Sequence, residues 1–218
     1  MINVVIPASG MGSRFGAGMP KQFLNLSGKE ILHRTISVFE KMDIINEIAI
    51  AVPSGYKGRV LKYGFAKVKY ITEGGASRAE SVVTALELLP KQTEIVLIHD
   101  GVRPFVDGET ILQVIEAAKK HGAAVACCPV TDTIKKVNSA GVITDTPDRS
   151  HLWNAQTPQG FKFDIILDAY TQNKEILRTI TDDSSLVANA VVVPSSRRNI
   201  KITTAEDMLI AKAFLEDI

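Results

Sequence analysis

The stretch that decides the fold is MINVVIPASGMGSRFGAGMPKQ, residues 1–22, where a short apolar run leads directly into a glycine-rich loop. The run MINVVIPA is almost entirely apolar and contains several β-branched side chains, which predicts a strand buried on both of its faces. Such strands are typical of parallel sheets that helices cover on both sides. A loop that follows one of them lies at the carboxyl edge of the sheet, where open α/β sheets bind their ligands.

The rest of the chain alternates apolar runs of strand length with segments of helical periodicity. This alternation predicts an α/β, Rossmann-like fold, a mainly parallel twisted sheet with helices on both faces. Thr204 is the expected N-cap of the last helix, with Asp207 at the third helical position. Further strands are predicted at 45–53, 68–72, 94–100, 123–130 and 191–195, and helices at Ile31–Lys41, Tyr56–Tyr63, Ala79–Leu89, Ile111–Lys120, Phe163–Gln172, Asp183–Ala190 and Ala205–Leu215.

One segment, Thr131–Gln159, breaks this alternation because it has little helical periodicity. Its run KKVNSAGVITD, residues 135–145, predicts a β-hairpin with Ser139–Gly141 near the turn. An excursion of this length within a compact α/β domain usually has a role of its own, such as a lid or a contact arm. We therefore predict a single domain over residues 1–218 with an inserted arm at about 131–159.

Composition and charge exclude several classes of protein. The chain has 218 residues, of which 45% are hydrophobic and 22% charged, and its formal net charge is +1. This balance is typical of an ordinary globular protein and provides no basic field for nucleic acid. The first ten residues lack the pattern of a signal peptide, and no apolar run approaches the roughly 20 residues of a membrane-spanning helix. We expect a cytoplasmic protein without nucleic-acid or membrane partners, in which Cys127 and Cys128 are buried hydrophobes.

The glycine-rich loop has the chemistry of an anion site. Its glycines, from Gly10 to Gly18, let backbone amides approach a ligand closely. Their spacing matches neither the dinucleotide fingerprint nor a P-loop. Arg14 and Lys21 bracket the loop and no acid lies in it, which favours a ligand with several adjacent phosphates. From the loop alone, a tight turn with two solvated cations is an equal alternative.

Seven segments, the loop included, follow the order in which they occur in one enzyme family. The chain resembles the 2-C-methyl-D-erythritol 4-phosphate cytidylyltransferase family, which belongs to the sugar-phosphate nucleotidyltransferases. The resemblance covers nearly the whole chain. It rests on PASGMGSRFGAGMPKQF (7–23), EGGASRAESV (73–82), VLIHDGVRPF (96–105), PVTDTIKKV (129–137), RSHLWNAQTPQGF (149–161), ITDDSSLV (180–187) and NIKITTAEDM (199–208).

The resemblance implies a reaction and a metal. The family transfers the cytidylyl group of CTP to 2-C-methyl-D-erythritol 4-phosphate, which gives 4-diphosphocytidyl-2-C-methyl-D-erythritol and pyrophosphate in non-mevalonate isoprenoid synthesis. On this interpretation Arg14 and Lys21 are catalytic, since they hold the triphosphate and stabilise the transition state. Asp100 binds Mg²⁺ together with phosphate oxygens. The implied nucleotide-binding residues are Pro7, Ala8, Ser9, Gly10, Gly12, Gly75, Ser81, Asp100 and Gly101.

The acceptor phosphate is expected in a separate basic pocket. The resemblance assigns Thr133, Arg149 and Lys201 to this pocket. Arg103 is either a further phosphate-facing cation or a partner for Asp100. In this family the inserted arm crosses to a second subunit, so the resemblance implies a homodimer formed through residues 131–159, in which Arg149 serves the neighbouring site.

Several residues have two possible roles at this level. His99 is expected to be structural, because an ionised phosphate needs no base, and Arg78 is structural or near the phosphates. Asp182 and Asp183 are expected to cap a helix, with binding of acceptor hydroxyls as the alternative. The family often has an acid where Ala76 stands, which weakens the prediction of CTP only mildly.

Two other functions compete with this prediction. A ribitol-5-phosphate cytidylyltransferase would share the chemistry, but PVTDTIKKV and Trp153 favour the methylerythritol phosphate. A non-catalytic CTP-binding module would need neither the two loop cations nor Asp100. We therefore predict a cytidylyltransferase that uses CTP, Mg²⁺ and methylerythritol phosphate.

Overall fold

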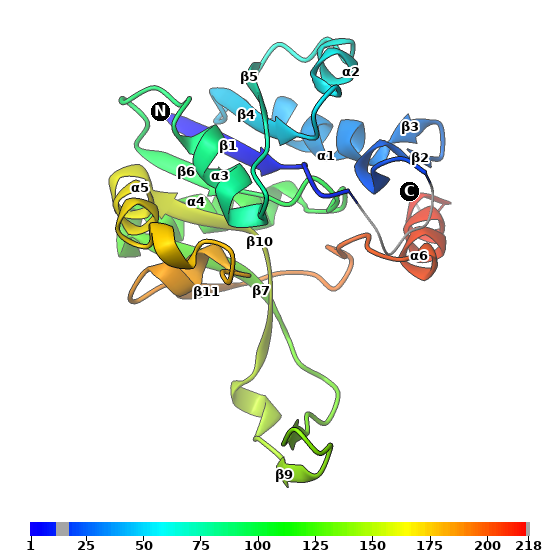
Figure 1. The fold of residues 1–218 in the computed structure, drawn as a ribbon, viewed down its shortest axis with the longest axis vertical. Coiled ribbons are helices and arrows are strands. Elements are labelled where there is room, and N and C mark those ends of the chain that lie inside the picture. The colour runs from blue at the N-terminus through cyan, green and yellow to red at the C-terminus, as the bar shows by residue number, and fades with distance from the viewer. Residues whose placement is uncertain (12–17, 217–218) are drawn as a thin grey trace.

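The computed structural model describes residues 1–11 and 18–216. Its centre is a seven-stranded sheet with the order β11-β7-β10-β6-β1-β4-β5 (Figure 1). β10 runs antiparallel to both of its neighbours, whereas the other neighbouring strands of this sheet are parallel. The sheet consists of β1 (Ile2–Pro7), β4 (Glu47–Val52), β5 (Val68–Glu73), β6 (Ile95–Ile98), β7 (Ala123–Pro129), β10 (Trp153–Lys162) and β11 (Val191–Pro194). The α-helices are α1 (Ile31–Glu40), α2 (Lys57–Leu61), α3 (Arg78–Leu86), α4 (Gly108–His121), α5 (Phe163–Gln172) and α6 (Ala205–Glu216).

The side chains of β1 explain why helices cover both faces of the sheet. Val4 and Ile6 pack with α1 and α4 in one buried cluster, and Val5 packs with α3 and α5 in another. Successive side chains of a strand point to opposite faces, so a strand as apolar as β1 must be covered on both sides. Figure 1 shows α3 in front of β1 and α1 behind it. The predicted Rossmann-like α/β fold is confirmed.

The last helix lies beside the sheet. α6 packs against the small hairpin of β2 (Asn25–Leu26) and β3 (Lys29–Glu30). Its start is the predicted capping box, because the Thr204 amide donates to Asp207 Oδ2 at 2.9 Å and the Asp207 amide donates to Thr204 Oγ1 at 3.3 Å. The segment that precedes this cap carries Lys201 back toward the centre of the molecule.

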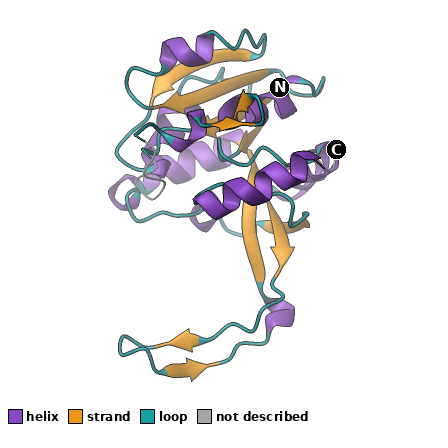
Figure 2. Cartoon of the chain, turned by 90° about the vertical axis from the view of Figure 1, so that its right-hand side faces the viewer, coloured by secondary structure: helices purple, strands orange, loops and turns teal. Residues whose placement is uncertain are grey.

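The segment predicted as an insertion forms an arm that projects from the body of the protein (Figures 1 and 2). Near its tip, β8 (Lys136–Val137) pairs antiparallel with β9 (Ile143–Asp145), as expected for the hairpin. Within β10, Gln159–Lys162 pair with both β6 and β7 in the sheet, whereas Trp153–Ala155 pair with β7 alone and are exposed. The strand register shifts between Ala155 and Gln159, and this irregularity interrupts any simple alternation that would predict a strand.

The helix predicted at Asp183–Ala190 is wrong. In its place is a single 3-10 turn, Asp183–Leu186. The side chains of this region form local bonds instead: Ser184 Oγ donates to Asp182 Oδ2 at 2.5 Å, and Ser185 Oγ donates to the Asp182 carbonyl at 2.6 Å. Serine and aspartate compete in this way with the backbone bonds of a helix.

Within the described parts of the chain, no helix has the length and apolar character that a membrane span requires. The cytoplasmic location expected from the sequence stays a prediction. Cys127 and Cys128 are both buried and unpaired with each other, as expected for small core residues.

Candidate functional site

A cavity of about 550 Å³ opens at the carboxyl edge of the sheet. β1 and β6 run parallel side by side, so the loop after Pro7 meets the turn at Asp100 there. The segments that precede α3 and α6 form the remaining walls. The described lining residues are Pro7, Ala8, Ser9, Gly10, Met11, Lys21, Gln22, Gly75, Ala76, Ser77, Arg78, Asp100, Val102, Lys201 and Thr203.

The charged side chains that line this cavity favour an anionic ligand. Its described lining side chains include three cations, Lys21, Arg78 and Lys201, and one carboxylate, that of Asp100. A cleft lined mainly by one sign of charge concentrates ligands of the opposite sign. The cavity therefore suits a ligand with several negative charges.

Two segments far apart in the sequence touch at the rim of the cavity. The hydroxyl oxygens of Ser9 and Ser81 lie 2.6 Å apart, although 72 residues separate them. Gly74 permits this approach, because a Cβ at that position would lie 2.3 Å from the Cβ of Ser9. The fully buried Ser81 also donates to the carbonyl oxygen of Ser77 at 2.8 Å. Ser81 therefore connects the loop after β1 to the start of α3 through hydrogen bonds, and it does not itself line the cavity.

Asp100 lies after β6 with three cations around its buried carboxylate. Oδ1 lies 3.0 Å from Arg78 Nε, and Oδ2 lies 3.3 Å from Arg103 Nε and 3.0 Å from Lys201 Nζ. Burial alone would raise the pKa of Asp100, but the positive charges of Arg78, Lys201 and Arg103 outweigh it and hold this pKa well below its ordinary range. The carboxylate is therefore ionised at neutral pH.

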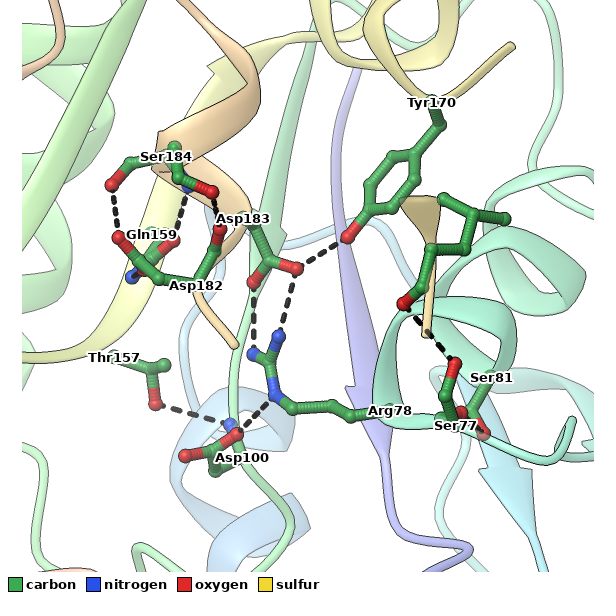
Figure 3. Close-up of polar contacts among 12 residues, drawn as sticks. Ser77, Arg78, Ser81, Asp100, Thr157, Gln159, Tyr170, Asp182, Asp183 and Ser184 are labelled. Carbon is green, nitrogen blue, oxygen red and sulfur yellow. Dashed lines mark hydrogen bonds and ion pairs between the residues drawn. The ribbon is translucent and has the colours of Figure 1, made fainter. Parts of the chain in front are cut away.

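Arg78 joins Asp100 to a second buried acid, Asp183 (Figure 3). The terminal nitrogens Nη1 and Nη2 of Arg78 each donate to one oxygen of Asp183 at 2.8 Å. Asp183 is fully buried and also accepts a hydrogen bond from the hydroxyl of Tyr170. Burial lowers the pKa of Arg78, but the charges of Asp183 and Asp100 reverse this and raise the pKa overall. Arg78 is thus a permanent cation between two carboxylates.

His99 is buried behind Asp100 and makes a contact at each ring nitrogen. Nε2 lies 3.0 Å from the carbonyl oxygen of Arg103, which can only accept, so Nε2 carries the proton. Nδ1 then accepts from the hydroxyl of Thr157 at 3.1 Å, and this oxygen accepts from the Asp100 amide at 3.0 Å. Neutral His99 therefore orients the turn that carries Asp100, which agrees with the structural role expected for it.

Burial lowers the pKa of His99 from 6.5 to about 4, which makes the stability of the protein depend on pH. Between these two values the unfolded chain binds a proton that the folded chain does not bind. The free energy of unfolding should therefore decrease as the pH falls from ~7 to ~4.5, by an amount on the order of 2 kcal/mol. Urea unfolding at the two pH values measures this difference, and His99→Gln should remove most of it.

The matched control for this experiment is His121→Gln, because His121 is exposed at the end of α4. This variant should lose as much stability on acidification as the wild type. A His99→Gln variant with the full acid-dependent loss would contradict the assignment to His99.

The structure brings most of the predicted site residues together. Arg103 lies behind the cavity wall, where it contacts Asp100 and donates from Nη1 to the Asn199 carbonyl oxygen at 2.7 Å, so it is a partner of Asp100. Gly101 also lies behind the wall, and a Cβ there would be 2.9 Å from that of Ala8. The predicted residues that line the cavity are Pro7, Ala8, Ser9, Gly10, Lys21, Gly75, Asp100 and Lys201.

The other predicted residues lie elsewhere. Thr133 and Arg149 are exposed on the arm and do not line the cavity of their own chain, and Arg149 Nη1 donates to the Thr131 carbonyl at 2.5 Å. Gly12 and Arg14 lie outside the described residues.

The role of Asp183 is the one that sequence reasoning missed. Its expected function as a helix cap is wrong, because its carboxylate binds Arg78, which lies 105 residues away in the chain. Asp182, the residue at the cap position, makes no capping bond and accepts from Gln159 and Ser184. No local pattern reports so distant a contact, and the one available signal was the place of both acids in the ITDDSSLV segment.

Comparisons with known proteins point in one direction. A family model described as 2-C-methyl-D-erythritol 4-phosphate cytidylyltransferase matches residues 2–217. A relative of that name from Alkaliphilus metalliredigens is 42% identical over 223 residues, which cover 98% of this chain and 92% of the relative. Another, from Clostridioides difficile, is 43% identical over 224 residues, which cover 99% of this chain and 94% of the relative.

Solved structures give the same picture. The crystal structure of 4-diphosphocytidyl-2C-methyl-D-erythritol synthase from Anaerococcus prevotii has a TM-score of 0.89 and 29% identity, and the match covers 99% of this chain and 96% of that one. The 2-C-methyl-D-erythritol 4-phosphate cytidylyltransferase from Thermus thermophilus has a TM-score of 0.81 and 30% identity, with 98% of each chain covered.

Proposed function

Because the chain belongs to the 2-C-methyl-D-erythritol 4-phosphate cytidylyltransferase family, we propose that the cavity at the carboxyl edge of its sheet is the active site. The protein is a nucleotidyltransferase of isoprenoid synthesis, which transfers the cytidylyl group of CTP to 2-C-methyl-D-erythritol 4-phosphate. One observation carries the assignment of the cavity: four distant segments of the chain meet there and set three cations against one carboxylate.

CTP is proposed to lie along the loop after β1. The turn before α3 brings the backbone of Gly75 and Ala76 to the cavity, where amide and carbonyl groups can bind the edge of cytosine. The triphosphate would follow the backbone at Ser9 and Gly10 toward Lys21, at the start of the 3-10 turn Lys21–Phe23.

The proposed reaction is an in-line displacement at phosphorus. A phosphate oxygen of the acceptor forms a bond to the α-phosphorus of CTP, while the bond from this phosphorus to the bridging oxygen breaks and its electrons leave with pyrophosphate. Lys21 and Arg14 would neutralise the charge that grows on the α-phosphate and on the leaving group. The attacking phosphate is already ionised near neutral pH, so the mechanism needs no general base.

Asp100 is proposed to hold Mg²⁺ together with phosphate oxygens of CTP. An ionised carboxylate at the cavity wall fits this ion, which commonly takes one or two carboxylates and completes its shell with phosphate oxygens and water. Among the described residues, no cluster of three or more His, Cys, Asp or Glu side chains could hold a metal, which is consistent with one protein carboxylate. Bound Mg²⁺ would supply positive charge to the phosphates, and Lys201 could then turn from Asp100 to a substrate phosphate.

The acceptor pocket is proposed to be completed by the arm of a second copy of the chain. Lys201 lines the cavity, whereas Thr133 and Arg149 lie on the projecting arm (Figure 2). The arm also exposes apolar side chains that an interface would bury, since Ile134, Val137, Val142 and Ile143 are between 39% and 59% exposed. A two-fold homodimer would bring the arm of each subunit to the site of the other.

This arrangement predicts complementation between two inactive variants. A heterodimer of a Lys21→Ala chain and an Arg149→Ala chain, purified through two different tags, would contain one intact site and one site with both defects. It should therefore retain about half of the wild-type turnover per dimer, although each homodimer is nearly inactive. Pyrophosphate release measures the turnover.

The matched control pairs a wild-type chain with a Lys21→Ala/Arg149→Ala double variant. If the arm serves the partner, each of its sites has one defect and the heterodimer should be nearly inactive. Half-activity in this control, with none in the first pairing, would place Arg149 in the site of its own chain and refute the proposed exchange of arms.

The substrate is tested by pyrophosphate release from CTP and Mg²⁺ with either methylerythritol 4-phosphate or ribitol 5-phosphate as acceptor. We expect release with the methylerythritol phosphate. Release with ribitol phosphate alone would retain the chemistry and change the acceptor. A folded protein that binds CTP but releases no pyrophosphate with either acceptor would be a nucleotide-binding module.

A further inference from the structure

The Asp183–Arg78 ion pair has no part in the proposed reaction, yet Arg78 also contacts Asp100, the proposed metal ligand. Arg78 Nε contacts Asp100 Oδ1 at 3.0 Å, while both terminal nitrogens of the same guanidinium bind Asp183 (Figure 3). A two-point bond between a planar guanidinium and a carboxylate has a defined geometry. Asp183 therefore fixes the plane of the guanidinium and, with it, the direction from which Arg78 approaches Asp100.

Asp183 is itself held in place. Its side chain is fully buried and accepts a hydrogen bond from Tyr170, whose ring packs in the core cluster of α3 and α5. The Arg78 side chain is 23% exposed, so it reaches the cavity, whereas Asp183 does not line the cavity. The carboxylate of Asp183 therefore lies on the side of the Arg78 guanidinium that faces away from the cavity.

The charges around Asp100 indicate what Asp183 contributes. Arg78, Arg103 and Lys201 carry three positive charges, and Asp100 and Asp183 carry two negative ones, so the formal sum is +1. Without the Asp183 charge the sum would be +2. A divalent cation would then meet stronger repulsion, and the terminal nitrogens of Arg78 would be released to compete for Asp100.

We propose that Asp183 and Arg78 are positioning residues for the metal-binding carboxylate. Asp183 binds the terminal nitrogens of Arg78, so that only Nε of this guanidinium contacts Asp100. The charge of Asp183 also offsets part of the positive charge that the divalent cation of the Mg²⁺–CTP complex would meet at this carboxylate. The inference rests on the proposed function, because it takes Asp100 as the metal ligand.

A purely structural role for the ion pair predicts a different result. A loosened wall would weaken CTP binding to a similar extent with and without Mg²⁺. The positioning role predicts that Asp183→Asn loses only the gain in CTP affinity that Mg²⁺ provides. The affinity for metal-free CTP is kept, because the extra positive charge in this variant does not repel the anionic nucleotide. The ratio of the two affinities therefore separates the two roles.

The experiment is calorimetric titration of CTP into the full-length protein without acceptor, once with Mg²⁺ and once with a chelator. We expect Asp183→Asn to lower the Mg²⁺-dependent gain in CTP affinity by about 10- to 100-fold, the usual cost of losing a residue that orients a metal ligand, while metal-free affinity changes less than about threefold. Arg78→Lys should lose a similar part of the gain, because an ammonium cannot span both carboxylates. Asp168→Asn is the control, since it makes the same charge change on the exposed side of α5.

Asp100→Asn separates failure of this inference from failure of the proposed metal site. If the wild type shows no gain with Mg²⁺, or Asp100→Asn retains the full gain, then the metal role of Asp100 fails and the inference fails with it. If Asp100→Asn loses the gain but Asp183→Asn and Arg78→Lys retain it, only the inference is overturned. Equal weakening with and without Mg²⁺ overturns it in favour of a structural role. If Asp183→Asn does not fold, Arg78→Lys and the milder Tyr170→Phe test the positioning role through the same ratio of CTP affinities with and without Mg²⁺.

Discussion

Replacing Lys21 with alanine is expected to lower kcat by at least about a hundredfold, the scale of losing one charge donor that acts in a transition state. Lys21 lines the proposed active site next to the loop after β1, where the triphosphate of CTP would lie. Its ammonium would interact most strongly when charge accumulates on the α-phosphate and on the departing pyrophosphate. The KM for CTP should therefore change much less than kcat in steady-state measurements of pyrophosphate release.

Lys91→Ala is the matched control for this variant, because Lys91 is exposed in the turn between α3 and β6 and its replacement makes the same change in net charge. It should have wild-type turnover. Arg14→Ala is expected to behave like Lys21→Ala, although Arg14 lies outside the described residues. Near-normal kcat in a folded Lys21→Ala protein would exclude the proposed catalytic role of Lys21.

The second large effect is expected for Asp100→Asn, which should reduce both turnover and stability. Loss of the proposed metal ligand should lower kcat at least about a hundredfold, since a catalytic metal ion contributes several kcal/mol of charge stabilisation. The neutral amide would also leave Arg78, Arg103 and Lys201 without their shared counter-charge. Removing one partner of a buried ion pair costs about 3 kcal/mol or more, which a shift of the urea midpoint would measure.

Asp107→Asn is a suitable control, because asparagine caps a helix as well as aspartate and Asp107 is the N-cap of α4. It should change neither the midpoint nor the turnover appreciably. An Asp100→Asn protein that is destabilised but has full, Mg²⁺-dependent turnover would show that Asp100 is only structural. A protein with wild-type stability would contradict the importance of the three ion pairs.

Local sequence patterns were sufficient for most elements of the fold. The apolar run before Pro7 predicted a strand covered on both faces, and Val4, Val5 and Ile6 are indeed divided between two buried clusters. The Thr204–Asp207 capping box was predicted correctly for the same reason, because all of its contacts lie within one helical turn. Local pattern did not indicate β10, because this strand contains a register shift between Ala155 and Gln159 that obscures the period of a strand.

The sequence by itself determined that a glycine-rich loop, an aspartate after a buried strand and a lysine before the last helix are present at the spacings of one enzyme family. Because parallel strands end at a common edge, it also indicated that the loop and Asp100 would meet. Only the tertiary structure decided which charges are paired there. Arg78 and Asp183 are 105 residues apart, and their contact depends on the packing of α5 against both α3 and the 3-10 turn at Asp183, which no local periodicity encodes. The same physical reason applies to the contact between Arg103 and Asp100 and to the burial of Arg103, whereas a role of Arg103 in substrate binding stays a prediction.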